Sequence, residues 1–354
     1  MLKQDLTDFS LVVANRTKKF IEAQKEEAIN IDITLVRSLQ KLEDFVMRGG
    51  KALRPFLVKL GFELAGGQVS ERLEIAAASI DLHHKHILIL DDIADRDEER
   101  YGGPTLEYAY HVFFEKDKDK EHHSRSFAML DGVWLGALAR EMLLTSGFEP
   151  QKLLNIIHIL NTTMYAQTLA GWQIHMLGTI QPLSKSTPQE FIKGLELVTA
   201  KYTFEGPLMI GLMLAENQDD TLVINLKSYA KYVGTAFQIQ DDILGLFGES
   251  KITGKPVGND VREGKKTLLL QDAYKSSSNE DCDFLEKVTG KINITSEEIK
   301  RVQQIVIDSG ALEKSKQMSR EMIDEGIASL ESLENSTAKE NLIELARYVI
   351  NRDK

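Results

Sequence analysis

Proline is scarce in this chain, and this scarcity limits the possible folds more than any other feature. Only seven prolines occur in 354 residues, so long stretches contain no residue that would break a helix. Within them apolar residues recur at spacings of three and four, as in Leu153, Ile156, Ile157 and Leu160, which is typical of an α-helix with one buried face. Alternating strand patterns are rare. The sequence therefore predicts an all-α fold, a single domain over residues 1–354 with roughly a dozen helices.

Composition excludes several classes of protein. Hydrophobic residues make up 42% of the chain, enough for a large core, and the net charge of −11 argues against a nucleic-acid binder. The only cysteine, Cys282, excludes a disulfide framework and a cysteine zinc site. The histidines near residues 83–86 lack the spacing of a zinc site. With no signal-peptide pattern and no apolar run of about 18–20 residues, we expect a cytoplasmic protein without a membrane anchor.

Acidic residues gather at one point inside an apolar stretch, in the sequence LILDDIAD. On a helix Asp91 and Asp95 share a face, and Asp92 is rotated by about 100° from Asp91. Like charges at this spacing repel each other. A divalent cation would turn the repulsion into attraction, and hard carboxylate oxygens suit magnesium, which also keeps waters and binds substrate phosphates. The segment therefore predicts part of a magnesium site.

A second acidic pair lies in FQIQDDILG, again inside an apolar helical pattern. Asp241 and Asp242 are adjacent here, and Gln238 precedes them by one helical turn. Either pair alone is more commonly a solvated surface feature. Two pairs embedded in apolar sequence favour a shared metal function, and neither has the glycine and alternating ligands of an EF-hand.

Basic residues accompany both acidic segments. Lys51 and Arg54 lie three apart in GGKALRP, where a helix is expected to begin, and helix-end amides with a point charge and a guanidinium can hold an anion. Arg100 follows the first acidic segment, and Lys255 and Lys265 follow the second. Carboxylates for magnesium together with cations for phosphate oxygens are the groups needed to hold diphosphates.

Taken in order, these motifs resemble the trans-isoprenyl diphosphate synthase (polyprenyl synthetase) family, most closely its bacterial geranylgeranyl diphosphate synthases. The matching runs are GGKALRP, HHKHILILDDIADRDEERYGGPT and FQIQDDILGLFGESKITGKPVGNDVREGKKT, and the resemblance covers roughly residues 40–270. It implies the isoprenoid synthase type I fold, with helices around a deep central cavity, and a homodimer. It also implies a magnesium-dependent prenyltransferase that condenses isopentenyl diphosphate with an allylic diphosphate, giving a longer all-trans prenyl diphosphate.

The resemblance also assigns roles to individual residues. Up to three magnesium ions are expected on Asp91, Asp92, Asp95, Asp241 and Asp242. The allylic diphosphate is expected on Arg100, Lys255 and Lys265, isopentenyl diphosphate on Lys51, Arg54 and His84, and a ligand-orienting role on Gln238. His86 and Ile87 would form the wall that limits chain length, and the medium-sized His86 favours a product of about 15–20 carbons.

Some positions depart from the family pattern. Tyr101 stands where the pattern has the second of two arginines before a glycine. Val198 stands where the pattern has a lysine, although the following Thr199 is kept and Lys201 lies three residues after Val198. Leu90 stands where the pattern has a histidine, and Val133 stands where it has an acid. The glutamine and acid of another pair correspond to Trp172 and His175, or to Gln173 in a shifted register. Each lost charged contact to phosphate would cost about 1.5–3 kcal/mol.

Three hypotheses follow from this pattern. The first is an active prenyl diphosphate synthase, favoured by the complete acidic set. The second is a homologous subunit that binds prenyl diphosphate or a partner synthase without efficient catalysis, favoured by Tyr101, Val198 and His175. The third is a class I terpene cyclase, or a prenyltransferase with another acceptor.

Overall fold

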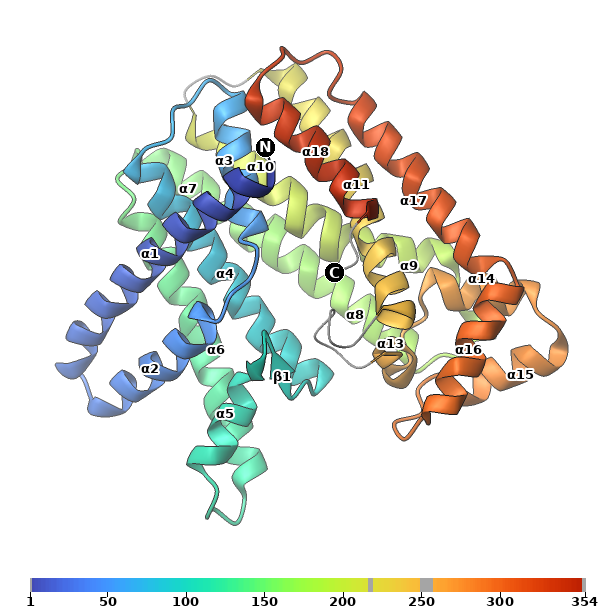
Figure 1. Cartoon of the computed structure of the whole chain (residues 1–354). Coiled ribbons are helices and arrows are strands. Elements are labelled where there is room, and N and C mark those ends of the chain that lie inside the picture. The colour runs from blue at the N-terminus through green and yellow to red at the C-terminus, as the bar shows by residue number, and fades with distance from the viewer. Residues whose placement is uncertain (1, 216–218, 249–256, 352–354) are drawn as a thin grey trace. The chain divides into compact units, whose positions relative to one another are not determined.

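The computed structural model describes residues 2–215, 219–248 and 257–351, and these divide into two compact units. The first contains Met1–Ile157 and Ile210–Asn217, and the second contains His158–Met209 and Gln218–Lys354. Almost all of the described chain is helical (Figure 1), which confirms the predicted all-α fold. The single domain over residues 1–354 and its central cavity stay predictions.

The first unit is built from helices and one short hairpin. Its elements are α1 (Leu2–Ile29), α2 (Ile33–Met47), α3 (Leu53–Leu64), α4 (Glu71–Asp95), β1 (Glu99–Arg100), β2 (Gly103–Pro104), α5 (Leu106–Phe113) and α6 (Lys120–Leu144). The chain passes between the units in α7 (Pro150–Ile159) and α10 (Gly206–Leu214). The glycine pairs 49–50 and 66–67 flank α3, which begins within GGKALRP as the sequence predicts.

Close packing of α4 against α6 fixes the orientation of the first acidic helix. A Cβ atom at Gly136 of α6 would lie 3.0 Å from the His86 ring of α4, and one at Gly132 would lie 2.9 Å from Ile89. The missing side chains therefore let the two helices approach. The contact also brings Nδ1 of His86 to 2.7 Å from the carbonyl oxygen of Gly132.

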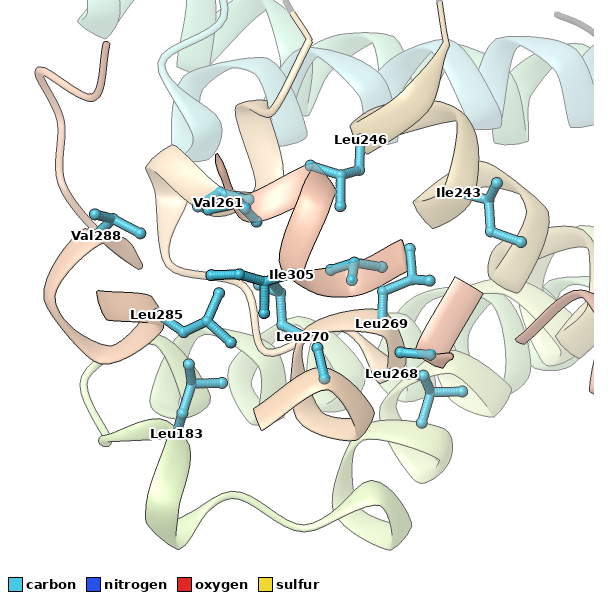
Figure 2. Packing of buried hydrophobic residues seen from close by; sticks show 14 of the residues in the cluster. Leu183, Ile243, Leu246, Val261, Leu268, Leu269, Leu270, Leu285, Val288 and Ile305 are labelled. Atoms are coloured by element: carbon cyan, nitrogen blue, oxygen red, sulfur yellow. The ribbon is translucent and has the colours of Figure 1, made fainter. Parts of the chain in front are cut away.

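The second unit consists of helices that surround its own apolar core. Its elements are η1 (Leu160–Ala166), α8 (Gln167–Thr179), η2 (Leu183–Lys185), α9 (Pro188–Leu195), η3 (Glu196–Glu205), α11 (Asp220–Phe247), α13 (Asn259–Glu263), α14 (Leu268–Ser276), α15 (Asn279–Val288), α16 (Ser296–Asp308), α17 (Ala311–Ala328) and α18 (Thr337–Asn351). Figure 2 shows part of this core, where Leu269, Leu285 and Ile305 are buried among leucines and valines from several helices. Burial of such side chains is the main stabilising contribution.

Helix starts in the second unit follow the local sequence. Thr187 caps α9 by accepting a hydrogen bond from the amide of Glu190, and Pro188 takes the first helical position. The glycine- and lysine-rich segment after the second acidic pair contains the short helix α13. Gly258 begins this helix with a φ of 77°, and Gly264 ends it with a φ of 79°, so glycines at both ends supply left-handed geometry.

The second acidic helix, α11, packs against the π-helical segment η3. A Cβ atom at Gly234 would lie 2.5 Å from the Cα atom of Ala200, so only glycine permits this approach. The contact brings Thr199 of η3 beside Gln238 of α11. Because π-helical turns shift the register of side chains and frequently occur at functional sites, this pairing is relevant to the site described next.

Candidate active site

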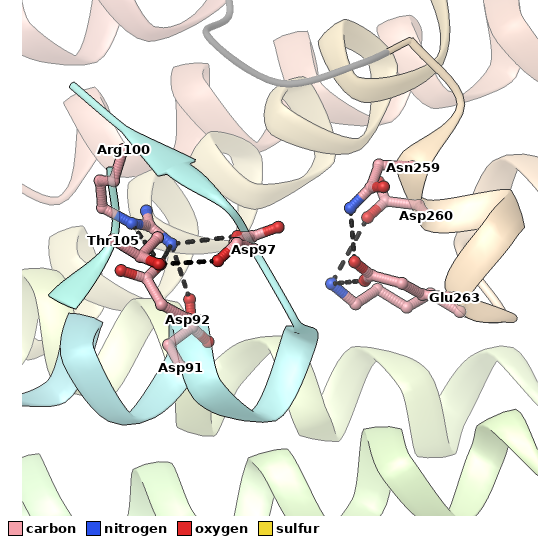
Figure 3. Close-up of polar contacts among 9 residues, drawn as sticks. Asp91, Asp92, Asp97, Arg100, Thr105, Asn259, Asp260 and Glu263 are labelled. Carbon is pink, nitrogen blue, oxygen red and sulfur yellow. Dashed lines mark hydrogen bonds and ion pairs between the residues drawn. The ribbon is translucent and has the colours of Figure 1, made fainter. Parts of the chain in front are cut away.

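The first acidic cluster lies at the end of α4 and is bound to one arginine. Nε of Arg100 donates to Oδ1 of Asp92 at 2.5 Å, and Nη2 lies 3.3 Å from an oxygen of Asp91 and 3.3 Å from an oxygen of Asp97 (Figure 3). Asp95 is the last residue of α4. The structure thus brings together Asp91, Asp92 and Arg100, three of the residues singled out in the sequence, and it adds Asp97.

The hairpin that follows α4 positions this arginine. In the β1–β2 pair Arg100 lies opposite Gly103, and the two turn residues, Tyr101 and Gly102, have φ values of 54° and 72°. Positive φ at both central positions is typical of a type I′ turn. Thr105 secures the base by donating from Oγ1 to the carbonyl oxygen of Asp97 at 2.9 Å. The hairpin therefore folds Arg100 back onto the acids.

Burial makes Asp92 an unusual carboxylate. Its side chain is 2% exposed, and burial raises its pKa to about 7 despite the opposing effect of Arg100. Burial alone would lower the pKa of Arg100, but Asp92 and Asp91 outweigh it and raise that pKa. Oδ2 of Asp92 is buried without a hydrogen-bond partner. A buried acceptor left unbonded is costly, so this oxygen fits a ligand that the side chains do not supply.

Cationic and imidazole groups also gather in the first unit. His84 on α4 has a pKa held well below its usual range by burial and by Arg54, Lys85 and Arg100. Arg54 lies in the first turn of α3, and Lys51 is exposed just before it. Cationic side chains that lower the pKa of their neighbours create a region of positive electrostatic potential, and such a region attracts anions. The predicted residues Arg54 and His84 therefore lie in a suitable place for a diphosphate.

In the second unit a hydrogen-bonded chain orients the second acidic pair. Oγ1 of Thr199 donates to Oε1 of Gln238 at 2.6 Å, and Nε2 of Gln238 donates to Oδ1 of Asp242 at 3.1 Å. Asp242 is 7% exposed, and its other oxygen has no hydrogen-bond partner. Burial, then the charges of Asp260 and Asp241, raise the pKa of Asp242 well above its usual range.

Asp260 on α13 is a member of this cluster that the sequence analysis did not single out. The charge of Asp260 raises the pKa of Asp242. Nζ of Lys265 lies 3.6 Å from Oδ1 of Asp260 and 2.6 Å from Oε2 of Glu263 (Figure 3). The sequence feature that could have identified Asp260 is its place as an acid in the glycine- and lysine-rich segment after Asp241 and Asp242. Lys255, the other predicted cation, lies outside the described residues.

We expect Gln238→Leu to reduce turnover about tenfold, because Asp242 loses the hydrogen bond that fixes its rotamer. Thr199→Val should have a smaller effect, since Gln238 keeps its bond to Asp242. Steady-state kinetics at saturating magnesium and substrate would measure both. Equal turnover in wild-type protein and the Gln238→Leu variant would exclude an orienting role for this glutamine.

Two departures from the family pattern, Val198 and His175, are packed against helices of the second unit. A Cβ atom at Gly171 would lie 2.5 Å from Cγ2 of Val198, and one at Gly194 would lie 2.2 Å from the His175 ring. His175 also stacks on Phe191, with ring centroids 5.1 Å apart, beside a cavity of about 310 Å³. Lys201 lies 2.5 Å from the carboxylate of Glu205. Val198 and His175 thus fill space between helices.

The acidic residues fit magnesium that is shared with water and substrate phosphates better than they fit a metal ligated by protein side chains alone. Across the three described ranges, no group of three or more His, Cys, Asp or Glu side chains could by itself hold an ion. Magnesium keeps several waters and shares one or two carboxylates with substrate phosphates. The unbonded buried oxygens of Asp92 and Asp242 are donors of that kind.

Three comparisons with known proteins agree with one another. A model of the polyprenyl synthetase family matches residues 37–306. The short chain isoprenyl diphosphate synthase of Methanocaldococcus jannaschii is 32% identical, over 73% of this chain and 72% of that protein. A crystal structure of geranylgeranyl pyrophosphate synthase from Corynebacterium glutamicum, complexed with isoprenyl diphosphate and magnesium, is 29% identical with a TM-score of 0.91, covering 98% of this chain and 99% of the other. The chain belongs to the polyprenyl synthetase family.

Membership of this family confirms the enzyme class expected from the motifs. The polyprenyl synthetase described here is a prenyltransferase that condenses isopentenyl diphosphate with an allylic diphosphate. Its similarity to the geranylgeranyl diphosphate synthase of Methanosarcina mazei, 28% identical over 91% of this chain and 92% of that protein, extends well beyond the acidic motifs. In the part of the chain that the structure describes, no helix is both long enough and apolar enough to cross a membrane.

Proposed function

We propose that this polyprenyl synthetase makes an all-trans prenyl diphosphate of about 15–20 carbons, with magnesium as its cofactor. The observation that supports this most is a pair of buried carboxylate oxygens, one on Asp92 and one on Asp242, that no side chain or backbone group satisfies. Asp91, Asp95 and Asp241 complete the proposed ligand set for up to three ions.

The proposed roles of the basic residues follow from charge. Arg100, already held by its aspartates, would receive oxygens of the allylic diphosphate once a metal neutralises those acids. Lys265 would act in the same way beside Asp260, and Lys255 is proposed for the same substrate. Lys51, Arg54 and His84 would bind isopentenyl diphosphate.

These groups serve a reaction in which charge moves onto the leaving diphosphate. The bond between the allylic carbon and its diphosphate oxygen breaks, the double bond of isopentenyl diphosphate attacks that carbon, and a proton is lost. Magnesium, when bound, would supply positive charge to the leaving oxygens. Cationic side chains bind and orient both diphosphates, and apolar walls exclude the water that would trap a carbocation.

We further propose a cytoplasmic homodimer. Apolar side chains project from one side of α6, where Met129 is 48%, Leu130 63% and Val133 58% exposed. An exposed apolar patch of this kind is typical of a protein interface. Analytical ultracentrifugation should show a dimer, and Leu130→Lys should dissociate it. A wild-type monomer at micromolar concentration would contradict the proposal.

His86 is the residue proposed to limit chain length. Its ring is held by the Gly132 carbonyl and lies against Gly136, and Ile87 beside it is also buried. We expect His86→Ala to shift the main product to longer chains by at least one isoprene unit, because a shortened side chain opens space near the acids. Radiolabelled products can be sized by reverse-phase chromatography. An unchanged product with His86→Ala would exclude His86 as the wall.

Product assays test the proposed function directly. Purified protein, magnesium and labelled isopentenyl diphosphate are incubated with allylic diphosphates of increasing length, and each allylic diphosphate is also incubated alone. A discrete longer chain supports the synthase. Hydrocarbon or alcohol from the allylic substrate alone would favour a terpene cyclase, and binding of a diphosphate without any product would favour a subunit that does not catalyse the reaction.

A further inference from the structure

Lys85 is a buried cation to which the proposed mechanism has so far given no role. It lies on α4 between His84 and His86, and its side chain is 2% exposed. Among the described residues it forms no ion pair with a carboxylate within 4 Å. Its ammonium instead donates to the carbonyl oxygen of Gly49. Because burial of an ammonium without a carboxylate partner is costly, a structural role alone gives a poor account of Lys85.

The ammonium of Lys85 lies close to the loop before α3 and to the turn of the β1–β2 hairpin. Its Nζ lies 4.5 Å from the centroid of the Tyr101 ring. A Cβ atom at Gly50 would lie 3.1 Å from Nζ and 3.6 Å from the hydroxyl oxygen of Tyr101. Gly50 has a φ of 118°, so glycine is favoured here both by its backbone conformation and by the closeness of these two groups.

Cations outnumber anions around this ammonium. Burial lowers the pKa of Lys85, Asp81 opposes this effect, and Arg100 and Arg54 lower the pKa further. The positive charges of Arg100 and Arg54 thus act on the ammonium of Lys85, and Arg100 is itself paired with Asp91, Asp92 and Asp97. A polyanion placed between the loop and α4 would relieve this repulsion.

We propose that Lys85 and the hydroxyl of Tyr101 bind the diphosphate of isopentenyl diphosphate, together with Lys51, Arg54 and His84. This inference rests on the proposed function and assigns two more residues to that substrate. One N–H group of the ammonium is held by Gly49, which leaves two for phosphate oxygens. Tyr101 is 42% exposed and presents a hydroxyl that can donate to the same anion.

The arrangement also accounts for the departure of this chain from the family pattern at position 101. An ammonium on α4, lying over the Tyr101 ring, places positive charge beside the position where the pattern has a guanidinium. The charge of the site would then be kept while its source moves from the hairpin to the helix. Loss of the lysine combined with an arginine at position 101 should therefore preserve the site better than loss of the lysine alone.

Lys85→Met provides the test. We expect its KM for isopentenyl diphosphate to rise about tenfold to a hundredfold, as for loss of a hydrogen bond to a charged group, with the KM for the allylic diphosphate within about twofold of wild type. The double variant Lys85→Met/Tyr101→Arg should recover most of the loss. Lys85→Arg should remain near wild type, because it keeps the charge.

Lys59→Met is the matched control, because Lys59 is also a buried lysine of the first unit but is paired with Asp5 at 2.6 Å. We expect it to lower the unfolding temperature with no change in either KM. Calorimetric binding of isopentenyl diphosphate provides a second measurement. If Lys85→Met does not fold, Lys85→Gln replaces it, since glutamine removes the charge and keeps an N–H donor.

The outcomes separate the two proposals. A folded Lys85 variant that binds isopentenyl diphosphate as wild type does would overturn the role of Lys85 and leave the proposed function intact. Equal increases in both KM values, accompanied by a lower unfolding temperature, would also overturn it by indicating general disruption. Wild-type protein that neither binds nor elongates with isopentenyl diphosphate would instead contradict the proposed function.

Discussion

Asp92→Asn should abolish nearly all prenyl transfer and at the same time stabilise the protein without metal at neutral and alkaline pH. We expect turnover to fall about a thousandfold, because the variant loses a charged oxygen that the proposed magnesium site uses to hold the leaving diphosphate. The folded protein gains stability because Asp92 is buried, its Oδ2 is unbonded, and asparagine has no charge to desolvate.

The stability effect depends on pH in a defined direction. The pKa of Asp92 is about 7 in the folded protein against 3.8 for an ordinary aspartate. At a pH between these two pKa values, folding takes up a proton. The free energy of unfolding of the wild-type protein therefore falls as pH rises from about 4 to 7. Asparagine mimics the protonated acid. The two proteins should have similar unfolding temperatures near pH 4, and the variant should be the more stable one above pH 7.

Glu107→Gln is the control for this experiment. Glu107 is a buried carboxylate of the first unit that lies 3.1 Å from Arg125, remote in function from the proposed site. We expect this substitution to leave turnover within about twofold and to reduce stability slightly, because a paired charge is lost. Turnover of Asp92→Asn within tenfold of wild type at saturating magnesium would show that Asp92 is not an essential ligand.

Asp242→Asn should produce the second large loss, about a hundredfold to a thousandfold in turnover. Asp242 belongs to the other acidic pair, is oriented by Gln238, and has an unbonded buried oxygen. The charge of Asp260 contributes to its raised pKa, so loss of either carboxylate lowers the repulsion in the cluster. Kinetics over a magnesium titration would separate weaker metal binding from a loss that excess metal does not recover.

Asp272→Asn is the matched control in the second unit. Asp272 is buried on α14 and lies 2.7 Å from Nζ of Lys314. Its substitution should reduce stability, because Lys314 loses its partner, while turnover stays within about twofold. If Asp242→Asn retained full turnover, or if Asp272→Asn lost as much, the second acidic pair would have no special part in the reaction.

Local sequence determined the features that depend on neighbouring residues alone. Scarce prolines and apolar spacing predicted the all-α fold, because a helix forms from contacts three and four residues apart. The helix expected to begin in GGKALRP is α3, which begins at Leu53. The adjacent acids at 91–92 and 241–242 could be recognised in the sequence as candidate site residues, because burial of charge inside an apolar helix is costly.

Contacts between distant segments could not be predicted in this way. Asp97 joins the first cluster through Arg100, which the hairpin folds back toward α4, and Asp260 joins the second cluster from the short helix α13. In the sequence nothing distinguishes Lys85 from the rest of its motif, and only the fold places it against the carbonyl oxygen of Gly49 and the Tyr101 ring. Thr199 acquires its role only because Gly234 allows η3 to touch α11.

The sequence by itself thus determined the helices, the family resemblance and the residues that carry charge, since these depend on composition and on spacing along one element. The tertiary structure alone decided which of those charges neutralise one another and which are buried without a partner. The physical reason is that desolvation and ion pairing depend on distances between atoms far apart in the chain. Asp92, bonded through one oxygen to Arg100 and unbonded at the other, is the plainest example.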